Sequence, residues 1–352
     1  MKKYFKLIAI IIFLFNNLLY ADKQEEKKLY DKAMELIDDY SGNSTNLYEA
    51  LYQIEKIKKI NSNSKYYFIS KGRYLRIKGY LYGDTYEDEA LEKSKSFIKK
   101  AIKIEPSYID SYFYGIPTYI YGNDIVSAKD FIKKTEKLVK SEKDRGKLLY
   151  MKTQLDLKLK KFDLVIENSN KILKLDIPEK FYYGVYSNLA QAYKNIKEYD
   201  KAESYYKKVI ELKSSAWNIF NLGSFYYNYK KEYDKAIKYC KEAISIMNFP
   251  LANKVLGKAY YKKAAKLYWD EKWYQDALEN FLLSVQYYPT SNGYYGLGLS
   301  YYQVGHGTKN KDLILKAKEA FEYSLELNPD NKYSKKYLFR VNELLTWIEQ
   351  NQ

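Results

Sequence analysis

The sequence has very little cysteine or histidine, and this excludes several kinds of site. Cys240 is the only cysteine and His306 the only histidine in 352 residues. A disulfide within the chain needs two cysteines, and structural zinc sites need several cysteine or histidine ligands. We therefore expect no disulfide, no bound metal and no cofactor, and we predict that Cys240 is a buried, unreactive thiol.

Residues that break helices or favour strands are also scarce. The chain has 6 prolines and 15 glycines, and valine and threonine are few beside leucine, isoleucine, lysine and glutamate. Such a composition favours helices over strands and leaves little room for long irregular loops. The predicted fold class is therefore all-α.

Known catalytic motifs are missing as well. The sequence contains no phosphate-binding loop, no zinc-protease helix motif and no nucleophile elbow. His306 lies between two glycines without an obvious partner, and acidic pairs such as Asp38 and Asp39 are typical of a helix surface. We predict a protein that is not an enzyme and has no catalytic residues.

Positive charge predominates, with a formal net charge of +16. The lysines are spread along almost every predicted helix instead of forming one block, which is typical of a solvated surface. The alternative is an acidic partner, because a basic surface speeds encounters with anionic molecules.

The only long apolar run is at the N-terminus. Three lysines in the first six residues precede a mostly apolar stretch from Leu7 to Leu19, and Ala21 offers a small residue at a cleavage point. This run is shorter than the roughly 20 residues that span a bilayer. We predict a signal peptide over 1–21, a periplasmic or secreted mature protein and no stable membrane span. Retention as an anchor is the alternative, and without a cysteine at the cleavage site we expect no lipoprotein.

From residue 22 onward, apolar residues recur at helical spacing in pairs of helices. The clearest pair has Tyr294, Leu297, Gly298 and Tyr301 in its first helix. Its second helix has Ala317 and Phe321 and ends before Pro329. The small residues let two helix backbones approach closely, and proline ends the second helix because it lacks an N–H group. The other predicted pairs are 29–40 with 47–60, 65–82 with 86–104, 107–121 with 124–139, 143–159 with 162–175, and three that contain Leu189 with Ala202, Gly223 with Ala236, and Gly257 with Ala277.

This order of residues resembles the tetratricopeptide repeat, a helix–turn–helix unit of about 34 residues. Five of the six prolines fall where a second helix is expected to stop. One such unit cannot bury its own apolar face, so neighbouring units must stack. The resemblance implies a right-handed superhelical solenoid of about eight hairpins over 22–330. A C-terminal capping helix over 331–352 would have an apolar side from Tyr333 to Ile348 and a polar side.

In this family the first helices line a concave groove that binds a peptide or a helix of a partner. Carried over by position, the resemblance implies an aromatic and basic groove with tyrosines of the kind that dominate binding interfaces. Gln191 and Ser224 stand where a terminal-carboxylate clamp would use asparagine, so we do not predict that clamp. The predicted groove residues are Ser187, Gln191, Lys194, Asn195, Trp217, Phe220, Tyr227, Asn228, Lys254, Lys258, Tyr261, Lys262, Asn292, Tyr295, Tyr302 and Gln303.

Two hypotheses about function remain open at this point. The first is an exported scaffold that binds a partner protein or peptide, an acidic one among the alternatives. The second is a carbohydrate-handling envelope protein, either a scaffold for polysaccharide export or a helical toroid that hydrolyses sugars with two carboxylates. We expect no nucleic acid, because the chain carries an export signal. Two insertions depart from the repeat length: 261–273 extends a first helix by about two turns, or ~12 Å, and 305–312 carries a loop over 305–310.

Overall fold

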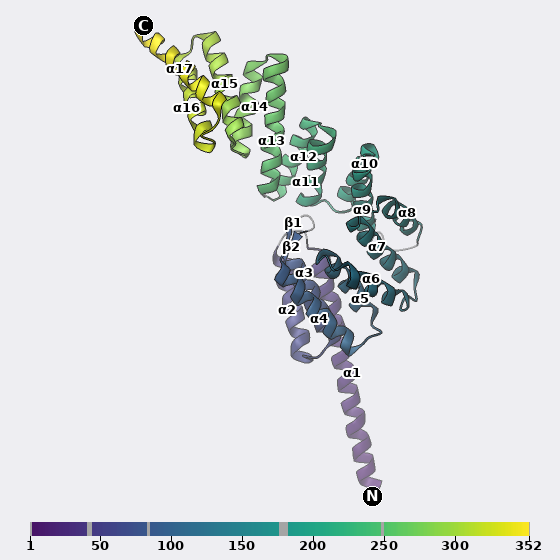
Figure 1. Cartoon of the computed structure of the whole chain (residues 1–352). Coiled ribbons are helices and arrows are strands. Elements are labelled where there is room, and N and C mark those ends of the chain that lie inside the picture. Colours follow the sequence, from purple (N-terminus) through teal and green to yellow (C-terminus); the bar gives the residue numbers. More distant parts are fainter. Residues whose placement is uncertain (1, 41–43, 83–84, 176–181, 248–249, 352) are drawn as a thin grey trace. The chain divides into compact units, whose positions relative to one another are not determined.

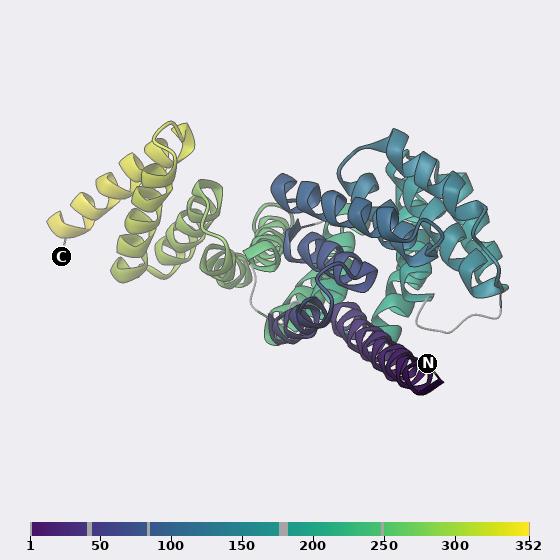
Figure 2. The same cartoon turned by 90° about the horizontal axis from the view of Figure 1, so that it is seen from below.

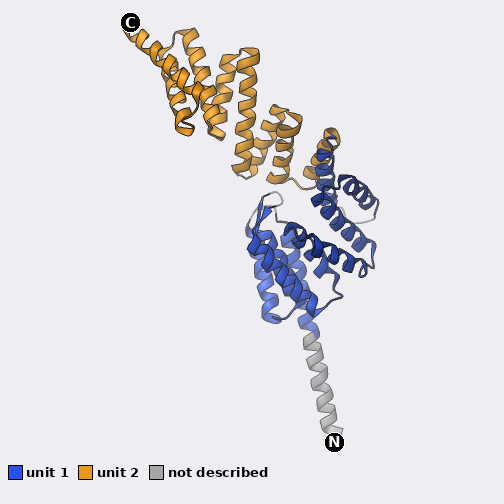
Figure 3. Cartoon of the chain, viewed as in Figure 1, with its two compact units in different colours: residues 1–198 blue, residues 199–352 orange. Residues whose placement is uncertain are grey.

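The computed structural model describes residues 2–40, 44–82, 85–175, 182–247 and 250–351, with side chains from residue 20 onward. Within these residues it contains seventeen α-helices, two short π-helical turns and one two-stranded sheet (Figure 1; Figure 2). The predicted all-α fold of consecutive helical hairpins is confirmed. The chain divides into two compact units, unit 1 (Met1–Glu198) and unit 2 (Tyr199–Gln352) (Figure 3).

Unit 1 is a series of helices in which each packs mainly against its neighbours in the sequence. The helix pairs predicted within residues 29–175 are all present. Its elements are α1 (Lys2–Asp38), α2 (Ser44–Ile60), α3 (Lys65–Lys78), β1 (Tyr80–Tyr82), β2 (Thr85–Tyr86), α4 (Asp88–Ile104), α5 (Ile109–Tyr121), α6 (Ile125–Glu136), α7 (Glu142–Lys158), α8 (Phe162–Ile172) and α9 (Tyr182–Asn195).

Unit 2 continues the same pattern and ends with a single helix. The predicted C-terminal helix is confirmed as α17. The elements of unit 2 are α10 (Tyr199–Leu212), α11 (Ala216–Phe225), η2 (Tyr226–Lys230), α12 (Tyr233–Ile246), α13 (Pro250–Lys266), η3 (Leu267–Glu271), α14 (Tyr274–Tyr287), α15 (Ser291–Thr308), α16 (Lys311–Leu327) and α17 (Lys332–Gln350).

The N-terminal helix α1 runs without a break from Lys2 to Asp38. The predicted boundary between signal peptide and repeats, at residues 21 and 22, therefore lies inside one helix. Among the described side chains of α1, those before Glu26 are exposed, and one face of the helix is buried from Glu26 onward. Among the described residues, none of the helices has the length and apolar character needed to cross a membrane.

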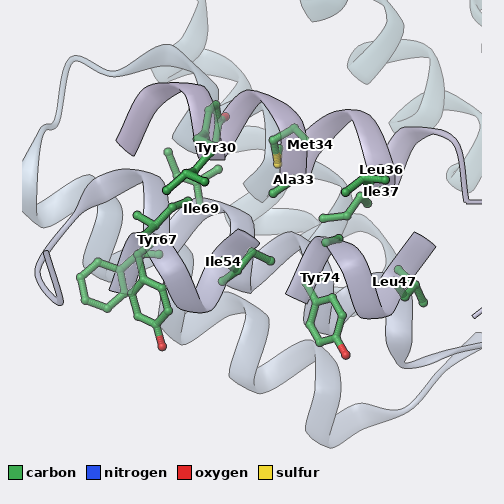
Figure 4. Close-up of a cluster of buried hydrophobic side chains, with 14 of the residues drawn as sticks. Tyr30, Ala33, Met34, Leu36, Ile37, Leu47, Ile54, Tyr67, Ile69 and Tyr74 are labelled. Atoms are coloured by element: carbon green, nitrogen blue, oxygen red, sulfur yellow. The ribbon is translucent and has the colours of Figure 1, made fainter. Parts of the chain in front are cut away.

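The core around α1 shows why this helix belongs to the repeats. Ala33 and Ile37 of α1 are buried against Ile54 of α2 and Ile69 of α3 (Figure 4). Ala33 and Ile37 belong to the apolar face predicted over 29–40. The first hairpin therefore shares its core with the next one, as expected for stacked repeats.

The helix predicted over 65–82 ends earlier than expected. After α3 stops at Lys78, the chain forms a β-hairpin in which β1 pairs antiparallel with β2. Gly79 permits α4 to approach the end of α3 closely, because a Cβ atom there would lie 2.2 Å from the Cβ of Ala90. The carbonyl of Gly79 accepts a hydrogen bond from the backbone N of Glu87 at 2.8 Å. The tyrosines of 80–86 favour strands, and the helical interpretation overlooked this signal.

Six hairpins turn at the same place, just after the first helix. A residue other than glycine adopts the left-handed conformation there, with φ between 54° and 66°. This backbone usually favours glycine or asparagine, yet five of the six residues are lysine. The recurrence shows that the weakly matching third and fourth pairs are built like the clear ones. The six residues are Asn123, Lys160, Lys197, Lys231, Lys272 and Lys309.

Both insertions are built from helix. In the seventh pair, α13 and η3 together reach from Pro250 to Glu271, so the predicted extension of a first helix is confirmed. The loop predicted over 305–310 is wrong, because α15 continues to Thr308 and α16 begins at Lys311. The glycine content suggested a loop, but Gly305 serves a close helix contact: a Cβ there would lie 2.8 Å from the Cβ of Leu313.

Glycine and phenylalanine interlock between the last helices of unit 2. A Cβ atom on Gly298 would lie 2.7 Å from the ring of Phe321, in the second helix of the same pair. A Cβ on Gly296 would lie 2.3 Å from the ring of Phe281, in the preceding helix. Both phenylalanines and Ala317 are fully buried. The predicted packing of small against bulky residues is confirmed here.

The capping helix α17 differs in detail from the prediction. Val341 and Leu345 are buried, as predicted. Tyr333, assigned to the packed side, is 68% exposed, and the side predicted to be polar carries the exposed residues Phe339 and Trp347. Tyr333 is the second residue of the helix, where the ring has few neighbours to pack on.

Candidate functional site

The pocket that includes residues of the predicted groove lies in unit 2 and has a volume of about 230 Å³. It is formed by η2, α13, the end of α14, the following turn and the start of α15. Its lining residues are Tyr227, Gly257, Lys258, Tyr261, Ser284, Tyr288, Thr290 and Asn292.

Glycine 257 allows the walls of this pocket to approach. A Cβ atom on Gly257 would lie 2.5 Å from the Cβ of Tyr288 and 2.9 Å from the carbonyl oxygen of Ser284. Any larger residue would therefore separate α13 from the end of α14. On the other wall, the Thr290 hydroxyl accepts a hydrogen bond from the backbone N of Gly293 at 3.1 Å and caps α15. This cap fixes the turn from which Asn292 projects.

The pocket combines neutral tyrosines with a cation. Burial raises the pKa of Tyr227 and of Tyr261 above the ordinary value, so both phenols keep their protons near neutral pH. Lys258 is exposed at the rim, and the Lys254 Nζ lies 5.6 Å from the ring centroid of Tyr288. No carboxylate is among the lining residues. The pocket therefore offers hydrogen-bond donors and positive charge, which suit carbonyl and carboxylate groups of a ligand.

Four of the sixteen predicted groove residues line this pocket. They are Tyr227, Lys258, Tyr261 and Asn292, and they come from three successive predicted repeats. The structure thus brings together side chains that are 65 positions apart in the sequence, from 227 to 292.

Other predicted residues of the sixth and seventh repeats lie outside the pocket lining. Phe220 is buried, with its ring centroid 5.6 Å from that of half-buried Trp217, so it contributes to packing. The exposed Asn228 donates a side-chain hydrogen bond to the carbonyl oxygen of Ser224 at 2.9 Å. Two further predicted residues, Lys254 and Lys262, are exposed on α13.

In the eighth repeat, the capping helix contacts the predicted groove residues. The rings of Tyr295 and Tyr302 each lie 6.1 Å from that of Tyr337 in α17, and burial raises the pKa of Tyr295 to about 12. Gln303 is exposed. These tyrosines therefore have aromatic partners within the chain.

The four predicted residues of the fifth repeat belong to α9 in unit 1. Ser187, Gln191 and Lys194 are half-buried, and Asn195 is exposed. The Asn195 side chain donates a hydrogen bond to the carbonyl oxygen of Gln191 at 2.8 Å. This contact is local to one helix turn.

The sequence reasoning missed half of the pocket. Ser284, Tyr288 and Thr290 come from the end of a second helix and the turn after it. The predicted register contains only positions on first helices, so it does not include Ser284, Tyr288 or Thr290. The available signal was Pro289, which marks the chain reversal that places them beside the next first helix.

The remaining candidate residues fit structural roles. Cys240 is fully buried, and burial raises the pKa of its thiol to about 12, which confirms the predicted inert thiol. His306 is exposed, with its ring stacked on Tyr302 at 5.9 Å. Over the described part of the chain, no group of three His, Cys, Asp or Glu residues is arranged to hold a metal ion.

Comparison with known families identifies two repeats directly. Family models of the tetratricopeptide repeat match residues 184–215 and 219–246. The matches cover α9 to α12, where the series of small and bulky residues is clear. Among curated proteins, none matches the sequence significantly.

One solved structure of a tetratricopeptide repeat protein is similar in fold, and two further structures match with lower scores. The C-terminal part of a repeat-containing protein from Cytophaga hutchinsonii matches with a TM-score of 0.50 and 17% identity, over 70% of this chain and 93% of that one. The Cut9–Hcn1 hetero-tetramer of the APC/C matches at 0.47 and 16%, over 84% and 52%. Yeast Tom70 matches at 0.41 and 16%, over 87% and 60%. The match thus spans about half of the Cut9–Hcn1 chain. The chain therefore contains two tetratricopeptide repeats, at 184–215 and 219–246, within a longer series of helical hairpins that is similar to a tetratricopeptide solenoid.

Proposed function

We propose that this protein is a non-enzymatic scaffold that binds an extended segment of a partner protein at the pocket of unit 2, after export from the cytoplasm. The observation that carries the proposal is the meeting of Tyr227, Lys258 and Asn292, from three different hairpins, in one pocket. Repeat arrays commonly bind partners on surfaces that several repeats build together.

The pocket favours a peptide as the ligand. A volume of about 230 Å³ accommodates one or two side chains of a ligand, not a folded domain. An extended peptide presents a carbonyl group about every 3.3 Å, which matches a wall of phenol, amide and ammonium donors. Tyrosines with two side-chain torsions lose little entropy on binding and are frequent among residues that dominate binding energy. The partner segment is therefore expected to be rich in acceptors, with an acidic residue beside Lys258.

The carbohydrate alternative has less support. Hydrolysis of a glycosidic bond needs two carboxyl groups about 5–9 Å apart, and the pocket lining contains no acidic residue. A polysaccharide-export scaffold without catalysis would need only contacts between tyrosines and sugar. Catalysis is therefore tested by the release of reducing sugars, and binding is tested separately by the capture of polysaccharide. Release of reducing sugars by the purified protein would contradict the proposed function.

Export is the part of the proposal that depends on residues 1–21. Cell fractionation followed by N-terminal sequencing checks it. A mature chain beginning near residue 22 in the periplasm or medium is expected. Recovery of the full-length chain in the cytoplasm would contradict export but not binding.

Two charge reversals on one helix test the pocket. Lys258 lines it, whereas Lys262, four residues later in α13, is exposed outside the lining. Lys258→Glu should reduce capture of the partner from envelope extract about tenfold, the scale expected for losing one charged contact. Lys262→Glu is the matched control and should change capture little. Equal effects of the two variants, with unchanged melting temperatures, would place binding elsewhere.

A further inference from the structure

Arg76 of α3 is a buried cation without a partner among the described residues of unit 1. Its side chain is 7% exposed, and no ion pair or hydrogen bond joins it to another described group. Its Nε is fully enclosed and unpaired, which leaves the terminal nitrogens as the accessible part of the guanidinium. A buried charge is costly unless a counter-charge and hydrogen bonds satisfy it.

Arg73, one helical turn earlier, shows that this isolation is not a general property of α3. Arg73 is similarly buried, but its guanidinium forms an ion pair with Asp38 and donates to the carbonyl oxygen of Met34 at 3.4 Å. Its Cζ lies 4.7 Å from the ring centroid of Tyr114. The charge of Arg73 therefore has a counter-charge within the described residues, and that of Arg76 has none.

Aromatic residues from several elements surround Arg76. Its Cζ lies 5.8 Å from the ring centroid of Tyr121 in α5, and that ring lies 4.7 Å from Tyr86 of β2. Burial raises the pKa of the Tyr150 phenol in α7 to about 12, and the positive charge of Arg76 opposes this rise. The end of α3, the β-hairpin and α5 therefore meet around this guanidinium, and its charge also acts on Tyr150 of α7.

The neighbouring groups have unused hydrogen-bonding capacity of both kinds. The Gln154 Nε2 donates to the Tyr150 hydroxyl at 3.1 Å, while the Gln154 Oε1 is buried and accepts nothing from the described residues. The Tyr150 hydroxyl, in turn, donates to no described acceptor. On α9, a Cβ atom at Gly184 would lie 2.4 Å from the Tyr150 hydroxyl. Glycine at this position therefore leaves room for that hydroxyl. Buried groups of this kind normally have partners.

We propose that unit 1 binds an acidic peptide segment at this place. The carboxylate of the peptide accepts hydrogen bonds from Arg76 and from the Tyr150 hydroxyl, and a backbone N–H next to it donates to the Gln154 Oε1. Arginine suits this role because its planar donors match a carboxylate. A phosphate would also accept hydrogen bonds from Arg76, but a phosphate monoester carries about −1.5 to −2 charges at pH 7, and the single guanidinium balances only one of them.

This inference rests on the proposed function only in taking the partner to be a peptide, because the site belongs to unit 1. It differs from the terminal-carboxylate clamp considered in the sequence, which would use asparagines at other positions. The carboxylate comes either from an acidic side chain or from a peptide C-terminus, and both sources present the same group to Arg76.

Binding of labelled peptides to the full mature chain tests the proposal. The probe is a short fluorescein-labelled peptide of glycine and glutamate with an amidated C-terminus, measured by fluorescence anisotropy. Matched peptides replace glutamate by glutamine, with either an amidated or a free C-terminus, and a fourth carries phosphoserine. Tighter binding of the glutamate peptide identifies a side-chain carboxylate, and tighter binding of the free C-terminus identifies a terminal one. Equal binding of all peptides, or binding of the phosphoserine peptide alone, would overturn the proposal.

Variants assign the binding to this place. Arg76→Gln should weaken binding of the acidic peptide at least about tenfold, and Tyr150→Phe, which removes one hydroxyl, should weaken it several-fold. The melting temperature of Arg76→Gln should be unchanged or higher, because the substitution removes an unpaired buried charge. Arg73→Gln is the control and should lower the melting temperature, because it removes the ion pair with Asp38 and the contact with the Tyr114 ring. Unchanged affinity in Arg76→Gln would overturn the proposal, whatever the Lys258→Glu experiment in unit 2 shows.

Discussion

In unit 1, the first helices of successive hairpins are joined by ion pairs and tyrosine hydroxyls, whereas in unit 2 aromatic rings seated on glycine join consecutive helices. The pairs of unit 1 include Arg73 with Asp38 and Lys147 with Asp110, each linking two first helices. The contacts of unit 2 include Phe281 on Gly296 and Phe321 on Gly298. The contrast is one of degree: unit 1 also seats Phe131 on Gly115, and unit 2 has ion pairs around Glu203 and between Lys263 and Asp234.

This difference explains where the repeat pattern is visible. Glycine–phenylalanine packing needs particular residues at fixed places, because a single added Cβ would collide with a ring. Ion pairs between long side chains tolerate shifts in position and leave no fixed series. The series of small and bulky residues is accordingly clear at 294–321, while residues 22–175 show only helical periodicity in the sequence. The family models match 184–246, which includes the end of unit 1 and the start of unit 2.

Tryptophan provides a way to observe the two units separately. All four tryptophans, at positions 217, 269, 273 and 347, belong to unit 2. Tryptophan emission therefore reports the unfolding of unit 2, whereas far-ultraviolet circular dichroism reports helices of both units. Repeat proteins need not unfold in a single step, so a change confined to one unit should shift one signal more than the other.

The largest effect is expected for Phe281→Ala in unit 2. The ring is fully buried against Gly296, so its removal leaves a cavity between α14 and α15. The free energy of unfolding should fall by ~3–5 kcal/mol, measured by denaturant titration with tryptophan emission. Leu282→Ala, on the neighbouring exposed position, is the control and should change stability by less than ~1 kcal/mol. A similar loss in the free energy of unfolding for both variants would mean that burial of the Phe281 ring does not stabilise unit 2.

Gly296→Ala tests the contact between Gly296 and the Phe281 ring by changing the glycine. The added Cβ would lie 2.3 Å from the Phe281 ring, so the free energy of unfolding should fall by ~1–3 kcal/mol. Gly307→Ala is a matched control in α15, because a Cβ there meets nothing within 4 Å. It should be neutral or stabilise the helix by up to ~1 kcal/mol, since alanine has the higher helix propensity. A stabilising Gly296→Ala would contradict the close packing.

Much of the fold could be predicted from the sequence, because helical periodicity and the placement of prolines report local structure. Pro106, Pro289 and Pro329 follow the ends of α4, α14 and α16 as predicted. Pro250 instead begins α13, where its missing N–H leaves no helical hydrogen bond unmade. Pro178 lies outside the described residues. Four of the five described prolines mark a helix boundary, whereas Pro117 lies inside α5, and the sequence alone does not say on which side of a proline the helix lies.

The candidate site was predictable only in part. The repeat register found Tyr227, Lys258, Tyr261 and Asn292, because first helices repeat at regular intervals. It could not find the Arg76 site, since that site depends on which charges remain unpaired after folding. The sequence does not show which of the two arginines, Arg73 or Arg76, has a counter-charge. The position of Asp38 in the fold shows that it is Arg73.

Glu203 tests whether charge also stabilises unit 2. Burial alone would raise the pKa of its carboxyl, but hydrogen bonds from Lys207, Lys230 and Tyr226 lower it from 4.5 to about 2. The stabilisation is therefore complete above about pH 4.5 and is lost as the pH falls toward 2. Glu203→Gln should cost ~1–2 kcal/mol at neutral pH, after allowance for solvent screening. The difference from wild type in tryptophan-detected unfolding should shrink between pH 4.5 and 3, and a pH-independent difference would contradict this origin.

The smallest effect is expected for Asp110→Asn in unit 1. The carboxylate of Asp110 accepts hydrogen bonds from Tyr30 at 3.3 Å and Tyr108 at 3.4 Å and lies 3.7 Å from the Lys147 Nζ. These long contacts predict a loss of ~0.5–1.5 kcal/mol, visible by circular dichroism and not by tryptophan emission. Added salt should reduce the difference, because screening weakens the wild-type ion pair. Asp130→Asn, in the exposed pair with Lys134, is the control and should have almost no effect. If both signals shifted together, the two units would unfold as one, and the contrast between their cores would not extend to their stability.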